Sequence, residues 1–148
     1  MRLWVTLPPE RGEEVLCVKT GSVNIPGTPL ALIGGLLVLT NQRLYQGPLD
    51  TRLAGKLLSV MGKVTGPTGT DTAIDLIVGW ANKARAVALQ DIASVDSVGR
   101  SSLVVTTENG KRRTFGVAAS ARTPVWSPNN VPHRDEMLAA IRQAISRV

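Results

Sequence analysis

The stretch Gly34-Gly35-Leu36-Leu37-Val38-Leu39-Thr40-Asn41-Gln42-Arg43-Leu44-Tyr45 decides how this chain folds. Its apolar run, Leu36 to Leu39, is too short to cross a membrane and has the length of a buried strand. Thr40-Asn41-Gln42 has turn chemistry, and a second β pattern follows at Leu44-Tyr45. We therefore expect a β-hairpin. Because a two-stranded ribbon is only marginally stable in water, the rest of the chain must cover it.

The composition of the 148-residue chain predicts one domain, residues 1–148, with an aliphatic core, since aromatic residues make up only 3% of it. The single cysteine, Cys17, excludes an intramolecular disulfide, and its apolar neighbours indicate a buried, inert thiol. Residues 1–11 lack the apolar region of a secretory signal, so a cytoplasmic location is expected.

The formal net charge of the chain is +6. A basic surface attracts anionic lipid or nucleic acid, or simply favours solubility. Proteins that bind single-stranded nucleic acid interleave aromatic stacking platforms with their basic residues. The few aromatic residues here are not interleaved with Lys or Arg, which disfavours a nucleic-acid partner.

The alternation of apolar residues predicts about seven short strands followed by one amphipathic helix. The strands are expected at residues 14–19, 30–39, 43–46, 86–89, 92–98, 103–107 and 113–117, and the helix at about 133–147. A bulge or turn is expected at 20–22, with Val23 and Ile25 continuing the first strand beyond it. Asn109-Gly110 favours a type I′ turn between the last two strands. This pattern is typical of a mainly β, α+β fold, in which two orthogonal antiparallel sheets are closed at one end by a C-terminal helix.

Residues 51–85 interrupt the β rhythm. Leu53, Leu57, Leu58, Met61 and Val64 recur at helical spacing, with Arg52, Lys56 and Lys63 on the other side. A breaker at 66–69 precedes a second amphipathic pattern that contains Ile77 and Trp80. We expect an inserted helical hairpin with an apolar side whose residues Leu57, Leu58 and Met61 are not all buried by the β core. It would be covered by its own second helix, by another subunit or by a bilayer.

Two motifs resemble those of GRAM domains and related bacterial pleckstrin-homology-like domains. Residues 37–45, Leu-Val-Leu-Thr-Asn-Gln-Arg-Leu-Tyr, match the pattern L-x-L-T-N-x-R-L, and residues 87–95 are similar to the step I-x-L-x-D-I-x-x-V. The resemblance implies a pleckstrin-homology fold and a binding role. Residues 20–29 contain no Lys or Arg, unlike the first loop of phosphoinositide-binding members, and the insertion at 51–85 also departs from the family pattern.

The sequence offers little for catalysis or metal binding. One histidine, His133, and one cysteine cannot build an ordinary zinc site, and no nucleophile elbow or P-loop is present. His133 is expected to be exposed or to cap the final helix. Arg43 either pins its turn through an ion pair or hydrogen bonds, or binds an anion. We expect no enzyme activity, no catalytic residue, no cofactor and no metal.

These observations predict a binding module that associates with anionic lipid, peripherally at the inner face of the membrane. The alternative is a protein–protein or homo-oligomer interface on the same inserted hairpin. A secondary basic cluster follows the last turn. The expected site residues are Arg52, Lys56, Leu57, Leu58, Met61, Lys63, Ile77 and Trp80, and the secondary cluster is Lys111, Arg112 and Arg113.

Overall fold

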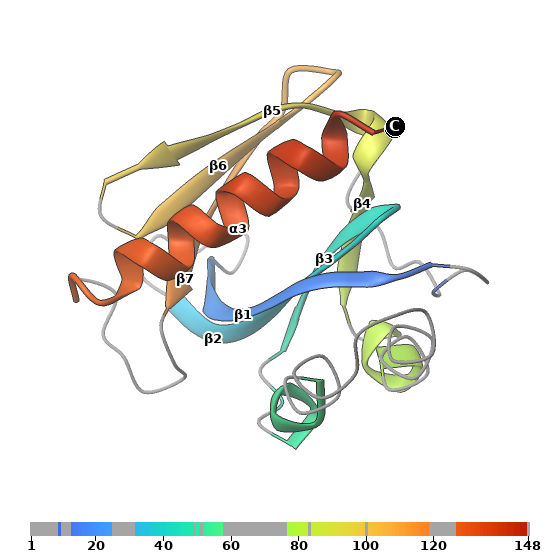
Figure 1. Cartoon of the computed structure of the whole chain (residues 1–148), viewed down its shortest axis with the longest axis vertical. Coiled ribbons are helices and arrows are strands. Elements are labelled where there is room, and N and C mark those ends of the chain that lie inside the picture. Colours follow the sequence, from blue (N-terminus) through green and yellow to red (C-terminus); the bar gives the residue numbers. More distant parts are fainter. Residues whose placement is uncertain are drawn as a thin grey trace.

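The computed structural model is an antiparallel seven-stranded sheet with a C-terminal helix, which confirms the predicted mainly β fold (Figure 1). It describes residues 9, 13–24, 32–48, 50, 52–57, 77–82, 84–99, 101–118 and 127–147. The strand order is β4-β3-β2-β1-β7-β6-β5. The elements are β1 (Val15–Asn24), β2 (Leu32–Thr40), β3 (Arg43–Pro48), β4 (Arg85–Ala88), the 3₁₀ turn η1 (Leu89–Asp91), β5 (Ile92–Val98), β6 (Ser102–Thr107), β7 (Arg112–Ala118) and α3 (Asn130–Ile145). Residues 52–57 and 77–81 are also helical.

Strand β1 joins the two halves of the sheet. It pairs with β2 along its whole length and, from Thr20 to Val23, also with β7 on its other edge. The two sheets expected from the sequence are thus halves of one hydrogen-bonded sheet. Gly21 permits the contact with β7, because a Cβ atom there would lie 2.1 Å from the carbonyl oxygen of Gly116.

Three predicted boundaries are wrong for identifiable reasons. The bulge or turn expected at Thr20-Gly21-Ser22 is instead continuous strand, because both edges of β1 are paired there. Leu89 begins η1 instead of ending a strand. The final helix begins at Asn130, three residues early, because Pro132 is tolerated in the first turn, where its missing N–H has no intrahelical partner to lose.

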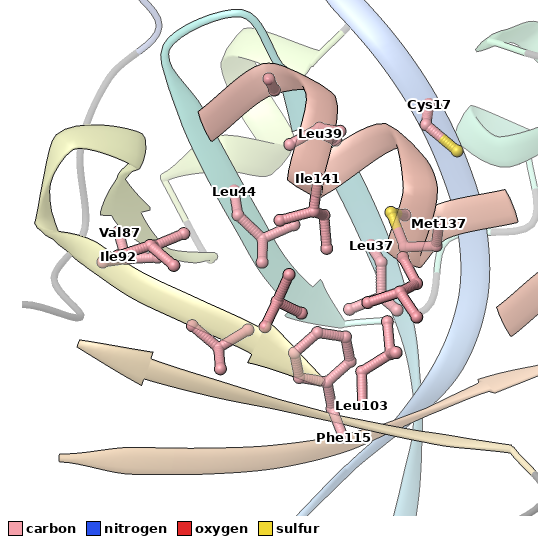
Figure 2. Close-up of a cluster of buried hydrophobic side chains, with 14 of the residues drawn as sticks. Cys17, Leu37, Leu39, Leu44, Val87, Ile92, Leu103, Phe115, Met137 and Ile141 are labelled. Carbon is pink, nitrogen blue, oxygen red and sulfur yellow. The ribbon is translucent and has the colours of Figure 1, made fainter. Parts of the chain in front are cut away.

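The first hydrophobic cluster lies between α3 and the inward face of the sheet (Figure 2). Figure 2 shows Met137 and Ile141 of α3 pointing toward side chains of the strands. Both halves of the sheet contribute to this cluster. Its buried residues are Cys17, Leu37, Leu39, Leu44, Val87, Leu89, Ile92, Val95, Leu103, Val105, Phe115, Val117, Met137, Leu138, Ile141 and Ala144.

A second hydrophobic cluster covers the opposite face of β1–β4. Side chains alternate along β2, so Leu37 and Leu39 enter the first cluster while Leu36 and Val38 enter the second. The helical residues 52–57 and 77–81 supply the other side of this second cluster, with Leu53, Ala54, Leu57, Ile77, Trp80 and Ala81. In Figure 1 these two short helical segments, green and yellow-green, lie across the sheet from the red α3. Strand β2 is therefore buried on both faces.

The packing of α3 predicts the effect of placing a charge at Ile141, which is completely buried against the sheet. Ile141→Asp should lower the free energy of unfolding by more than about 3 kcal/mol, because it leaves an unpaired carboxylate in an apolar site. Urea denaturation measures this. Gln143→Asp, on the exposed side of the same helix, is the matched control. Equal losses in the two variants would contradict the packing described.

Candidate functional site

Residues 52–57 form an amphipathic helical turn that is fixed to the sheet. Its start is capped by Asp50, whose Oδ1 accepts a hydrogen bond of 3.0 Å from the Leu53 N–H. Leu53 and Leu57 are buried in the second cluster, whereas Arg52 and Lys56 are exposed. Packing of the apolar side thus holds a pair of basic side chains outward.

The apolar members of the expected site are packed inside the domain. Leu57, Ile77 and Trp80 are buried together in the second cluster, and the rings of Trp80 and Tyr45 lie 6.4 Å apart between centroids. Gly47 permits this close packing, since a Cβ atom there would lie 2.6 Å from Cζ2 of Trp80. Of the three coverings left open by the sequence, the second helical segment covers Leu57, together with the sheet.

That Leu57, Leu58 and Met61 are not all buried by the β core stays a prediction. Leu57 itself is buried, because the sheet has a second apolar face. Leu36 and Val38 form that face, and their alternation with Leu37 and Leu39 could not be assigned to opposite partners from the sequence alone. Leu58, Met61 and Lys63 lie outside the described residues.

The secondary basic cluster is divided by the strand pleat. Lys111 and Arg112 are exposed, whereas Arg113 is half-buried. Arg113 alternates with the core residue Phe115 and therefore lies on the inward face. Burial, followed by the nearby charge of Arg85, lowers the pKa of the Arg113 guanidinium. The three residues are adjacent in the sequence, but Arg113 lies on the inward face of the sheet, apart from the exposed Lys111 and Arg112.

The turn between β6 and β7 differs from the expected type I′. A type I′ turn requires positive φ at both central residues, and among the described residues only Gly99 and Gly110 have positive φ. The Thr107 N–H donates to the Lys111 carbonyl at 2.9 Å, which encloses the three residues 108–110. Gly110, at φ +84°, occupies the left-handed position of this three-residue loop.

A buried polar network lies behind the β2–β3 turn. Glu13 is 1% exposed, and the Tyr45 hydroxyl donates to its Oε1 and Oε2 at 2.9 and 3.0 Å. The Thr40 hydroxyl donates to the same carboxyl group, and Nη1 of Arg43 donates to the Tyr45 oxygen at 3.4 Å. Burial raises the pKa of the Tyr45 phenol. Arg43 therefore helps to hold the turn in place and has a structural role. The network also explains the presence of Thr40, Arg43 and Tyr45 in the stretch of residues 37–45.

His133 is neither fully exposed nor a helix cap. Its Nδ1 lies 2.9 Å from Nζ of Lys19, which also forms an ion pair of 3.1 Å with Glu136. These contacts join β1 to the first half of α3. No sequence pattern indicated the contact between Lys19 and His133, because the two residues are far apart in the chain.

Cys17 on β1 is buried, and its burial raises the pKa of the thiol to about 11. The thiol therefore stays protonated at neutral pH, which is the state of an inert cysteine.

Within the described ranges, no three His, Cys, Asp or Glu side chains are grouped to hold a metal ion. Nor is any helix among those residues long and apolar enough to span a bilayer.

No family model matches this chain, and no curated protein matches it. Among solved structures, the chain is similar to the crystal structure of N-terminally truncated linker-DH/PH domains of p115-RhoGEF, with a TM-score of 0.54 and 8% sequence identity. The match covers 93% of this chain and 30% of that chain. The fold is of the pleckstrin-homology type. At this identity, the similarity establishes the pleckstrin-homology-like fold alone.

The Glu13 network generates a stability prediction. Glu13→Ala should lower the free energy of unfolding by about 2–3 kcal/mol, because it leaves the buried Tyr45 and Thr40 hydroxyls without their acceptor. Glu14→Ala is the control, since only the backbone of Glu14 contacts the Asn41 turn; it should change stability by about 0.5 kcal/mol or less. Chemical denaturation compares the two. A loss for Glu13→Ala as small as that of the control would contradict the network.

Proposed function

We propose that this pleckstrin-homology-like domain is a non-enzymatic binding module, of the GRAM type, that associates peripherally with an anionic membrane surface at its cytoplasmic face. The observation that carries the proposal is the outward pair Arg52 and Lys56. Their helical turn is anchored by Leu53 and Leu57, so the two charges sit on a rigid surface. Because the backbone of this turn is already ordered by packing, its ordering adds no further entropy cost when the basic side chains meet a charged partner.

Charge arithmetic indicates weak, reversible association. A basic residue near an anionic bilayer contributes about 1 kcal/mol, so this pair contributes about 2 kcal/mol, or roughly thirtyfold in affinity. Lys63, which the sequence places on the same side of the first amphipathic segment, adds to this contribution in the proposal. Association of this strength is sensitive to salt, because exposed charges are screened over a Debye length.

The chemistry of the reactive side chains supports a binding role over catalysis. The Cys17 thiol is buried and its pKa is raised, and His133 is engaged with Lys19. The nearby charge of Lys19 favours the thiolate of Cys17, but burial outweighs it and keeps the thiol protonated at neutral pH.

A protein partner, or a second copy of the chain, is the alternative occupant of the same helical surface. Val78, on the helical segment 77–81, is 47% exposed and supplies an apolar contact there. Leu57, Ile77 and Trp80 are buried, so such an interface would use the exposed side of the insertion.

The membrane proposal is tested by liposome co-sedimentation. Vesicles of phosphatidylcholine with and without phosphatidylserine are compared for the parent chain and for the double variant Arg52→Gln/Lys56→Gln. The double variant should bind the anionic vesicles roughly thirtyfold more weakly, with nearly unchanged melting, because both side chains are exposed.

The matched control is Lys111→Gln/Arg112→Gln, which removes the same charge from the hairpin at the end of β6. It should reduce binding much less than the first double variant. If the two double variants lose the same binding affinity, binding depends on net charge alone, which contradicts a defined binding surface at Arg52 and Lys56. If the parent chain does not bind anionic vesicles and sediments as a dimer at the concentration of the assay, the membrane proposal is replaced by the alternative of an interface with a second copy of the chain.

A further inference from the structure

Strand β5 is one of the two edge strands of the sheet. It stands last in the strand order, and among the described strands it pairs only with β6 (Figure 1). A free edge presents N–H and C=O groups to which a strand of another chain can add. The other edge strand, β4, has only four residues and begins with Arg85, whereas β5 has seven residues. The longer edge, β5, is therefore the one that most needs protection.

The sheet register shows which backbone groups of β5 face the open edge. The Thr107 N–H donates to the Lys111 carbonyl, so the backbone groups of Thr107 face β7. Backbone groups of alternate residues point to the same side of a strand, so those of Val105 also face β7. Val95 lies opposite Val105, and the two form a non-hydrogen-bonded pair. The N–H and C=O groups of Val95, and of Ser97 two residues further on, therefore point away from β6 to the open edge.

The side chain of Arg142 on α3 occupies this edge. Its Nε and Nη2 donate to the Val95 carbonyl at 3.3 and 3.2 Å, and Nη2 also lies 3.4 Å from Oδ1 of Asp96. The side chains of Arg142 and Asp96 are 56% and 65% exposed, and an ion pair so exposed adds little to stability. The guanidinium group thus covers an outward acceptor of β5 at a place where the fold itself gains little from the contact.

The sequence of β5 supplies little protection of its own. The strand contains one charged residue, Asp96, and neither Lys nor Pro, which commonly protect natural edges. A bulge between Ile92 and Ser94 interrupts the pairing at the start of the strand, but Ser94 to Val98 pair regularly with β6. Val98 is also 47% exposed. From Ser94 onward, protection of the edge comes from α3 through Arg142.

We propose that Arg142 is an edge guard that prevents a second copy of this chain from adding its β5 to the β5 edge. Two copies related by a two-fold axis would pair their β5 strands antiparallel, in an isologous interface. The hydrogen bonds would come from the outward groups of Val95 and Ser97. Whether the pairing joins Val95 to Val95 or Val95 to Ser97, it needs the Val95 carbonyl. That carbonyl is held by Arg142, so the guarded edge cannot pair with itself.

Sedimentation velocity of the full chain over a concentration series tests the edge guard. Arg142→Ala should self-associate at least about tenfold more strongly than the parent chain, because each dimer uses two freed Val95 carbonyls. Its melting temperature should change little, since the Arg142 side chain is exposed. Arg147→Ala removes the same charge from an exposed position just after α3. This matched control should associate no more strongly than the parent chain.

Ser97→Pro, added to Arg142→Ala, shows whether the association uses the β5 edge. Proline lacks the outward N–H that Ser97 offers to another strand, and it is tolerated on edge strands where that N–H is not used within the sheet. The double variant should return to the self-association of the parent chain. A dimer formed at the Arg52 and Lys56 surface would persist in the Ser97→Pro background, so the two interfaces are distinguished and the edge guard does not depend on the membrane proposal.

Amide hydrogen exchange gives a direct readout of strand addition. In Arg142→Ala, the N–H groups of Val95 and Ser97 should exchange more slowly in concentrated than in dilute solution, because they become hydrogen-bonded in the dimer. The proposal is overturned if Arg142→Ala associates no more strongly than the parent chain. It is also overturned if the double variant with Ser97→Pro associates as strongly as Arg142→Ala alone.

Discussion

The structure depends on burial of β2 from both faces. Leu36 to Leu39 are consecutive apolar residues in a strand whose side chains alternate, so no single partner layer can cover them. A continuous apolar run is the pattern of a strand that is covered on both sides. Here α3 and the opposing strands cover Leu37 and Leu39, whereas the helical segments 52–57 and 77–81 cover Leu36 and Val38. The helical segments 52–57 and 77–81 therefore form a third layer against the sheet.

This layering also sets where polar chemistry can occur. The apolar side of residues 52–57 is used in packing, which leaves Arg52 and Lys56 as the surface that can meet a partner. On the outer face of the sheet, Glu13 closes the end of the second cluster through hydrogen bonds with Tyr45 and Thr40. On the inner face, the apolar rows end at Gln46, Arg85 and Arg113. The apolar layers thus determine where these polar side chains lie.

Much of the fold could be predicted from local sequence patterns. The β2–β3 hairpin, strands β5 to β7 and the stripe of α3 were identifiable because each is a local apolar period with its own turn or cap signal. Features that depend on long-range register were not identifiable. The continuous β1 requires its second partner, β7; Gln46 meets Arg85 only through the pairing of β3 with β4. The turn at Asn109-Gly110 shows the limit of dipeptide rules, since only the glycine takes a left-handed conformation.

The most direct measurement compares Leu36→Ala with Leu37→Ala by urea denaturation. These adjacent residues are completely buried in the two different clusters. If the insertion packs as a true layer, each variant should lose about 2–5 kcal/mol of unfolding free energy, as expected for leucines truncated in a close-packed interior. A loss of unfolding free energy below about 1 kcal/mol for Leu36→Ala, together with a large loss for Leu37→Ala, would show that the outer face of β2 is not packed. This result would contradict the burial of β2 on both faces.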